Sequence, residues 1–155
     1  MNSIKESFTN RNNNMMYDIQ LMSFEKIDIE ETKRVCPQFK KRDGILPVAV
    51  QKSSTGQILM LASVNEEAFR YSIENKVAAF YSTSRNKLWV KGETSGNCLQ
   101  LDEVLMDCDQ DAFVYKVTLL KGGVCHTLNQ HGENRKACFY RALNINKNSL
   151  DFLEK

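Results

Sequence analysis

Residues 99–120, LQLDEVLMDCDQDAFVYKVTLL, decide the fold class, because they contain two predicted strands joined by an acidic segment. In the second half the large apolar side chains recur at every second position, at Phe113, Tyr115, Val117 and Leu119. Successive side chains of a strand point to opposite faces, so this period of two predicts a strand with one buried face. Residues 99–106 form the other predicted strand. The stretch therefore indicates a β-sheet.

The chain before this stretch predicts further short strands. Two apolar runs, residues 45–51 and 57–63, flank the polar segment KSSTG and are typical of a β-hairpin. Residues 78–81 and 88–90 are expected to be two more strands on either side of a polar turn. Several short strands with hairpin-length turns favour a mainly antiparallel sheet.

Helices are expected to be few. Asn65 is a suitable N-cap, and Glu66 and Glu67 after it favour the positive end of a helix that should run to about residue 75 or 76. A short helix is also expected at residues 25–34, ended by a proline, and another within residues 143–155. The predicted fold class is α+β.

The predicted organisation is one compact domain over residues 17–155, after a disordered tail over residues 1–16. The tail, MNSIKESFTNRNNNMM, has no helical or strand period and few apolar residues. The whole chain has 155 residues, a length that suits one domain.

Composition excludes several classes of protein. The net charge is +2, too small for a dedicated nucleic-acid binder, and no apolar stretch approaches the ~20 residues of a membrane span. We find no secretory signal, and the five cysteines are an odd number, so we expect a cytoplasmic protein with reduced thiols. We expect no nucleic-acid or membrane partner.

The acidic segment is a candidate metal site. If it is extended, Asp107, Asp109 and Asp111 lie on one face, where three like charges call for a cation such as Mg²⁺. Cys108 would then point to the opposite face. A solvated acidic turn is the alternative, and the pattern alone leaves both open. An EF-hand calcium loop is excluded, since its glycine and final glutamate are missing.

Three cysteines are candidate zinc ligands, because two histidines cannot make a histidine-rich site. Cys108, Cys125 and Cys138 would leave one coordination position open for water. The alternative is that they are small buried apolar side chains, since no Cys-x-x-Cys pair exists. His126, beside Cys125, is either structural or placed for proton transfer. Cys36 and Cys98 are expected to be structural.

Polar loops over residues 82–97 offer donors that suit phosphate, with Arg85 fitted to a bidentate contact. A solvated polar hairpin is the alternative.

Taken in order, these segments resemble the phosphoribosyl-AMP cyclohydrolase family. The resemblance covers residues 44–141 and rests on KGETSGN at 91–97, DCDQD at 107–111, CHT at 125–127 and CF at 138–139. It implies a monofunctional enzyme of histidine biosynthesis that hydrolyses the adenine ring of 1-(5-phosphoribosyl)-AMP at the N1–C6 bond. It also implies a homodimer.

The resemblance assigns the site residue by residue. It implies Cys108, Cys125 and Cys138 as ligands of a zinc ion that activates water, with Cys108 from one chain and the other two from its partner. It implies Asp107, Asp109 and Asp111 as the Mg²⁺ site. His126 is expected to transfer protons. The phosphoribosyl groups are expected to contact seven residues: Ser84, Arg85, Lys91, Glu93, Thr94, Ser95 and Asn97.

The chain departs from the family pattern between Cys125 and Cys138. Residues 128–136 include an insertion of about six residues, which affects the expected loop geometry. A catalytically inactive, zinc-stabilised nucleotide-binding module is the alternative function. A zinc base deaminase is disfavoured, because the chain lacks the His-x-Glu and Pro-Cys-x-x-Cys pattern.

Overall fold

The structure, a computed structural model, describes residues 28–153. The tail expected over residues 1–16 lies outside them. The described elements are, in chain order, a 3-10 helix η2 (Phe39–Arg42), strands β1 (Leu46–Lys52) and β2 (Ile58–Val64), helix α1 (Glu66–Asn75), and strands β3 (Ala79–Ser82), β4 (Lys87–Val90), β5 (Leu99–Met106), β6 (Phe113–Leu119), β7 (Arg141–Asn144) and β8 (Ser149–Phe152).

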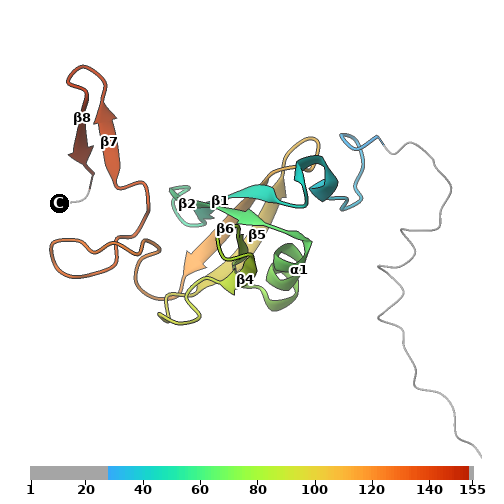
Figure 1. The fold of residues 1–155 in the computed structure, drawn as a ribbon, viewed down its shortest axis with the longest axis horizontal. Coiled ribbons are helices and arrows are strands. Elements are labelled where there is room, and N and C mark those ends of the chain that lie inside the picture. The colour runs from blue at the N-terminus through green and yellow to red at the C-terminus, as the bar shows by residue number, and fades with distance from the viewer. Residues whose placement is uncertain (1–27, 154–155) are drawn as a thin grey trace, which may run out of the picture.

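A four-stranded sheet in the order β2-β1-β6-β5 forms the body of the domain (Figure 1). The β1–β2 and β5–β6 pairs are antiparallel hairpins, whereas β1 and β6 pair in parallel at the middle of the sheet. β3 with β4, and β7 with β8, make two separate antiparallel pairs. Within residues 28–153, one α-helix and mainly antiparallel strands confirm the predicted α+β class.

The core lies on the face of β6 that carries the large apolar side chains at every second position. Phe113, Tyr115 and Val117 are buried, and the inward residues of β1 pack in the same cluster. Helix α1 covers this cluster with Phe69, whose ring stacks on Phe113 with centroids 4.8 Å apart. The period of two therefore identifies the buried face correctly.

Helix α1 begins as its sequence predicts and is fixed to β3 by a buried serine. The Asn65 side chain accepts a hydrogen bond from the Ala68 N–H at 2.9 Å, which makes it the N-cap. One turn further on, the buried Ser72 hydroxyl accepts from the Ala79 N–H at 3.0 Å and lies 2.8 Å from the Ala68 carbonyl oxygen. This hydroxyl satisfies backbone groups of both elements.

The helix expected at residues 25–34 is wrong over its described part, residues 28–34. The Asp28 carboxylate accepts from the Glu30 N–H and the Thr32 hydroxyl accepts from the Arg34 N–H. Such local side-chain bonds compete with helical ones, so the segment forms turns. Between residues 28 and 45, the one short helix that the structure describes is η2, which follows Pro37 instead of preceding it.

The helix expected within residues 143–155 is also wrong, because β7 and β8 form a hairpin there. Asn144 Oδ1 accepts from the Lys147 N–H, and Asn148 adopts a φ of 49°, a left-handed value that asparagine tolerates better than most residues. The asparagine-rich turn therefore decides the conformation. Figure 1 shows this hairpin standing away from the four-stranded sheet.

No helix among residues 28–153 is long and apolar enough to cross a membrane.

Replacing Ser72 with alanine should destabilise the domain by about 1–3 kcal/mol, because the buried Ala79 N–H loses its hydroxyl partner. Urea unfolding measures the change. Asn75→Ala is the matched control: the exposed Asn75 side chain bonds only the Tyr71 carbonyl of its own helix, so we expect a change within about 0.5 kcal/mol. Equal effects of the two substitutions would contradict the role of Ser72.

Candidate functional site

The acidic segment forms the turn between β5 and β6. One oxygen from each of Asp107, Asp109 and Asp111 lies within 4.8 Å of the other two, so the carboxylates converge as their spacing predicts. The extended geometry behind that prediction is wrong, because β5 ends at Met106 and Gln110 adopts a φ of 54°. The turn folds the carboxylates together, with Asp107 Oδ1 accepting from the N–H groups of Asp111 at 2.9 Å and Ala112 at 3.1 Å.

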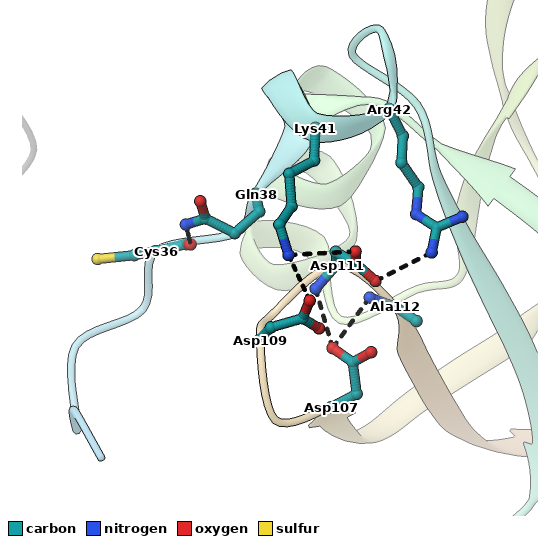
Figure 2. A network of polar contacts seen from close by, with 8 residues as sticks. All are labelled: Cys36, Gln38, Lys41, Arg42, Asp107, Asp109, Asp111 and Ala112. Carbon is teal, nitrogen blue, oxygen red and sulfur yellow. Dashed lines mark hydrogen bonds and ion pairs between the residues drawn. The ribbon is translucent and has the colours of Figure 1, made fainter. Parts of the chain in front are cut away.

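Two cations from η2 neutralise part of this charge (Figure 2). Lys41 bonds Asp109 and reaches Asp111 at 3.5 Å, while Arg42 pairs with Asp111 at 3.3 Å. The hydrogen bond between Lys41 and Asp109 lowers the pKa of that carboxyl and raises the pKa of the ammonium. The Lys41 ammonium therefore contacts two of the three carboxylates.

The buried side chain of Gln110 fixes the turn against the segment before η2. Its Oε1 accepts from the Cys36 N–H at 2.7 Å, and its Nε2 donates to the Arg34 carbonyl at 3.0 Å. The Gln38 N–H donates to the Gln110 carbonyl at 2.9 Å. Sequence reasoning missed Gln110 and Lys41, since their partners lie about seventy positions away in the chain and no local pattern marks them.

A second group of ionisable side chains contains Cys125 and Cys138. Burial raises the pKa of the Cys125 thiol, but hydrogen bonds from the Thr127 hydroxyl and N–H, and from Cys138, outweigh it, so the pKa lies below its ordinary value. The Thr127 hydroxyl is 3.0 Å from the Cys125 sulfur. Burial, followed by the charge on Cys125, raises the pKa of Cys138. The two cysteine side chains are therefore hydrogen-bonded neighbours whose pKa values are shifted in opposite directions.

Backbone bonds across the insertion bring these two cysteines together. The Cys125 N–H donates to the Arg135 carbonyl, and the Arg135 N–H donates to the Thr127 carbonyl, both at 3.0 Å. The Cys138 N–H donates to the Leu59 carbonyl of β2 at 2.7 Å. Gly123 permits this packing, because a Cβ there would overlap the carbonyl oxygens of residues 134 and 135. The insertion is thus a hairpin closed at its base.

Cys108 does not join the other two thiols within one chain. In the described part of the chain, the aspartates of the turn are the only set of three potential ligands that converge. Cys108 is exposed in that turn and not on a strand face, which corrects the expected placement. Figure 1 shows the β5–β6 turn beside η2, at the opposite end of the sheet from the segment that follows β6.

Two further predicted site residues lie near the thiol pair: Lys91, which interacts with both thiols, and His126, which follows Cys125 in the chain. Burial lowers the pKa of the half-buried Lys91 ammonium, and the nearby charges of Cys138 and Cys125 oppose that shift. Lys91 therefore belongs to the thiol group and does not line the polar cleft described next. The His126 side chain is exposed.

A polar cleft of about 260 Å³ brings together four of the predicted substrate-binding residues: Arg85, Glu93, Thr94 and Ser95. Ser84 and Asn97 do not line it. Asn97 is buried and donates to the Asn134 side chain at 3.3 Å, so it joins the cleft loop to the insertion. A larger hollow of about 620 Å³, between η2 and the start of α1, contains none of the predicted site residues.

The acidic turn, the cleft and the two cysteines lie in a part of the chain that is similar to known proteins. The family model for phosphoribosyl-AMP cyclohydrolase matches residues 60–140. A phosphoribosyl-AMP cyclohydrolase of Chlorobium chlorochromatii is 43% identical over 114 residues, which cover 73% of this chain and 78% of that protein. Another, from Caulobacter vibrioides, is 39% identical over 130 residues, or 83% of this chain and 88% of that protein. The chain belongs to the phosphoribosyl-AMP cyclohydrolase family.

The chain is thus an enzyme of histidine biosynthesis, a phosphoribosyl-AMP cyclohydrolase. The alternative, an inactive nucleotide-binding module, is not favoured. The histidine biosynthesis bifunctional protein HisIE of Thermus thermophilus is 46% identical over 110 residues, which cover 71% of this chain and 48% of that protein.

The family match includes the acidic turn, the cleft and both adjacent cysteines, but not η2 or strands β7 and β8. The cations that neutralise the aspartates therefore come from outside the matched part.

Replacing Lys41 with methionine should make Mg²⁺ stabilise the protein more than it stabilises the wild type. The ion would no longer compete with an ammonium group for the oxygens of Asp109 and Asp111. The measurement is the change in Tm on adding excess MgCl₂. Lys40→Met is the matched control, since Lys40 is an exposed lysine of the same short helix. Equal Mg²⁺-induced shifts in all three proteins would contradict competition by Lys41.

Proposed function

We propose that the chain hydrolyses the N1–C6 bond of 1-(5-phosphoribosyl)-AMP as a homodimer with separate zinc and magnesium sites. The observation that carries this proposal is the pair of chemically different donor sets inside the family match. One set is soft and contains the adjacent sulfurs of Cys125 and Cys138. The other is hard and consists of the three carboxylates of the acidic turn.

The residues of the thiol group fit zinc. Zinc binds thiolate sulfur, and Cys125 already has the lowered pKa that favours its charged form. Two cysteines from one chain leave room for Cys108 of a second chain as the third ligand. When bound, zinc supplies Lewis-acid chemistry that lowers the pKa of water.

The residues of the acidic turn fit Mg²⁺, which prefers carboxylate oxygens. Asp107, Asp109 and Asp111 would hold the ion, and its chemistry there is to bind and orient phosphate oxygens. Lys41 and Arg42 hold Asp109 and Asp111 in place, and backbone N–H groups hold Asp107, so the donor set is formed in advance.

The chain's own residues supply binding and proton transfer. Arg85, Thr94 and Ser95 line the cleft and would bind a phosphate of the substrate through charge-assisted hydrogen bonds. Glu93 and Ser84 belong to the same loops. Asn97 holds the cleft loop against the insertion.

Lys91 and His126 are assigned to the end of the site near the thiols. The half-buried cation of Lys91 would hold negative charge on the sulfurs or on a substrate phosphate. His126 is exposed beside Cys125, and we propose that its ring moves a proton to or from the attacking water.

The distance between the two ends of the sheet supports a dimer. Cys108 and the Cys125–Cys138 pair are separated by β6, so Cys108 of a second chain would complete the set of three thiolates. In a two-fold dimer each such contact occurs twice, which gives two equivalent sites.

An absorbance assay of phosphoribosyl-AMP hydrolysis tests the function directly. The purified protein should turn the substrate over, lose activity with a chelator, and regain it with zinc and Mg²⁺. Zinc content should fall in the Cys→Ser variants at positions 108, 125 and 138, because each loses a thiolate ligand. Cys36→Ser and Cys98→Ser are the controls and should keep full zinc.

The aspartate variants separate the two metals. Asp107→Asn, Asp109→Asn and Asp111→Asn should keep zinc and lose activity. Zinc loss in these variants equal to that in Cys108→Ser would overturn the two-site proposal. A folded, metal-loaded wild type without turnover would overturn the function.

Complementation tests the shared zinc site. Cys108→Ala protein refolded with an equal amount of a Cys125→Ala/Cys138→Ala double variant should regain activity. Half the dimers are mixed and each has one complete site, so about a quarter of the wild-type sites should return. Activity at the level of the two parents, in samples shown to contain the mixed dimer, would place all three ligands in one chain.

A further inference from the structure

Arg135, in the insertion that separates Cys125 from Cys138 along the chain, packs against two neighbouring aromatic rings. Its guanidinium carbon lies 4.1 Å from the centroid of the Tyr140 ring and 5.3 Å from that of Phe152. The two rings are 5.9 Å apart. Planar guanidinium groups stack favourably on aromatic faces, so this cluster fixes the Arg135 side chain.

The backbone of Arg135 is hydrogen-bonded to Cys125. The Arg135 carbonyl accepts from the Cys125 N–H, and the Arg135 N–H donates to the carbonyl of Thr127, whose hydroxyl lies against the Cys125 sulfur. Arg135 therefore contacts Cys125 through its main chain, while its side chain contacts Tyr140, two positions after Cys138.

The C-terminal hairpin completes the cluster. The Leu153 N–H donates to the Tyr140 carbonyl at 2.9 Å, which places β8 and its Phe152 ring over Arg135. Strands β7 and β8 otherwise expose their side chains and lie outside the family match. The Arg135 cluster gives this hairpin a contact with the segment that carries both thiols.

We propose that Arg135 is a positioning residue that sets the separation of Cys125 and Cys138 for metal binding, with the C-terminal hairpin as its support. The link runs from the Cys125 backbone through Arg135 to the Tyr140 ring. Because a loop separates the two cysteines along the chain, a cross-link near the base of that loop limits how far they move apart. This inference rests on the zinc site of the proposed function.

Zinc affinity, measured by competition with a chromophoric chelator, is the first test. Arg135→Ala and Tyr140→Ala should each bind zinc about tenfold more weakly, the usual effect of losing a group that orients a ligand. The double variant should be no weaker than either single one, because both remove the same link. Tyr140→Phe keeps the ring and should bind zinc like the wild type.

The matched control is Arg141→Ala. Arg141 also places its guanidinium over the Tyr140 ring, at 5.0 Å, but it lies on the exposed strand β7. Loss of zinc affinity in Arg141→Ala equal to that in Arg135→Ala would overturn the specific role of Arg135. Phe152→Ala, an exposed change near the chain end, provides a further variant should Arg135→Ala fail to fold, and it should weaken zinc binding as well.

Disulfide formation in metal-free protein is the second test. In a background with serine at positions 36, 98 and 108, glutathione disulfide should oxidise the Cys125–Cys138 pair more slowly in Arg135→Ala than in the parent. Unchanged zinc affinity and unchanged oxidation rate would overturn the inference. If the wild type binds no zinc, the proposed zinc site fails, and the oxidation rates alone decide whether Arg135 positions the thiols.

Discussion

Strand β6 is the constraint on which the rest of the structure depends. Its buried residues Phe113, Tyr115 and Val117 pack into the core, and its edges pair with β1 and β5. Seven residues of strand span roughly 20 Å. The acidic turn comes directly before β6 in the chain, and the segment with Cys125 and Cys138 comes after it. This strand therefore keeps the carboxylates and these two thiols at opposite ends of the sheet. Within one chain, Cys108 is therefore kept apart from Cys125 and Cys138.

Much of the fold follows from local sequence patterns. The alternation in β6, the turn before β2 and the Asn65 cap each depend on neighbours within a few residues, so all three are read correctly. The parallel pairing of β1 with β6 joins segments about sixty-five positions apart, and no local period encodes it. Both wrongly predicted helices fall where Asp, Thr or Asn side chains accept hydrogen bonds from nearby backbone N–H groups. The spacing of apolar residues carries no information about such bonds.

The sequence predicts which side chains form the candidate site, but it does not predict which residues contact them. The spacing of the aspartates predicts their convergence, yet a turn fixed by the buried Gln110 produces it. The residues of the cleft loop follow from composition and the resemblance, but only the fold moves Lys91 to the thiols and makes Asn97 a link to Asn134. These roles depend on long-range packing, which a single sequence does not display.

Both donor sets have a cation of their own. Lys41 and Arg42 pair with the aspartates, and Lys91 lies beside Cys125 and Cys138. Each group can therefore fold with part of its negative charge balanced, which avoids the cost of bringing like charges together unpaired. Under the proposed function, a metal ion would have to displace the ammonium group at each donor set. Lysine offers one charge and no preferred coordination geometry, so a divalent ion that matches the donors would have the advantage. Sulfur would then select a soft cation and carboxylate oxygen a hard one, and the lysines would set how strongly each ion has to bind.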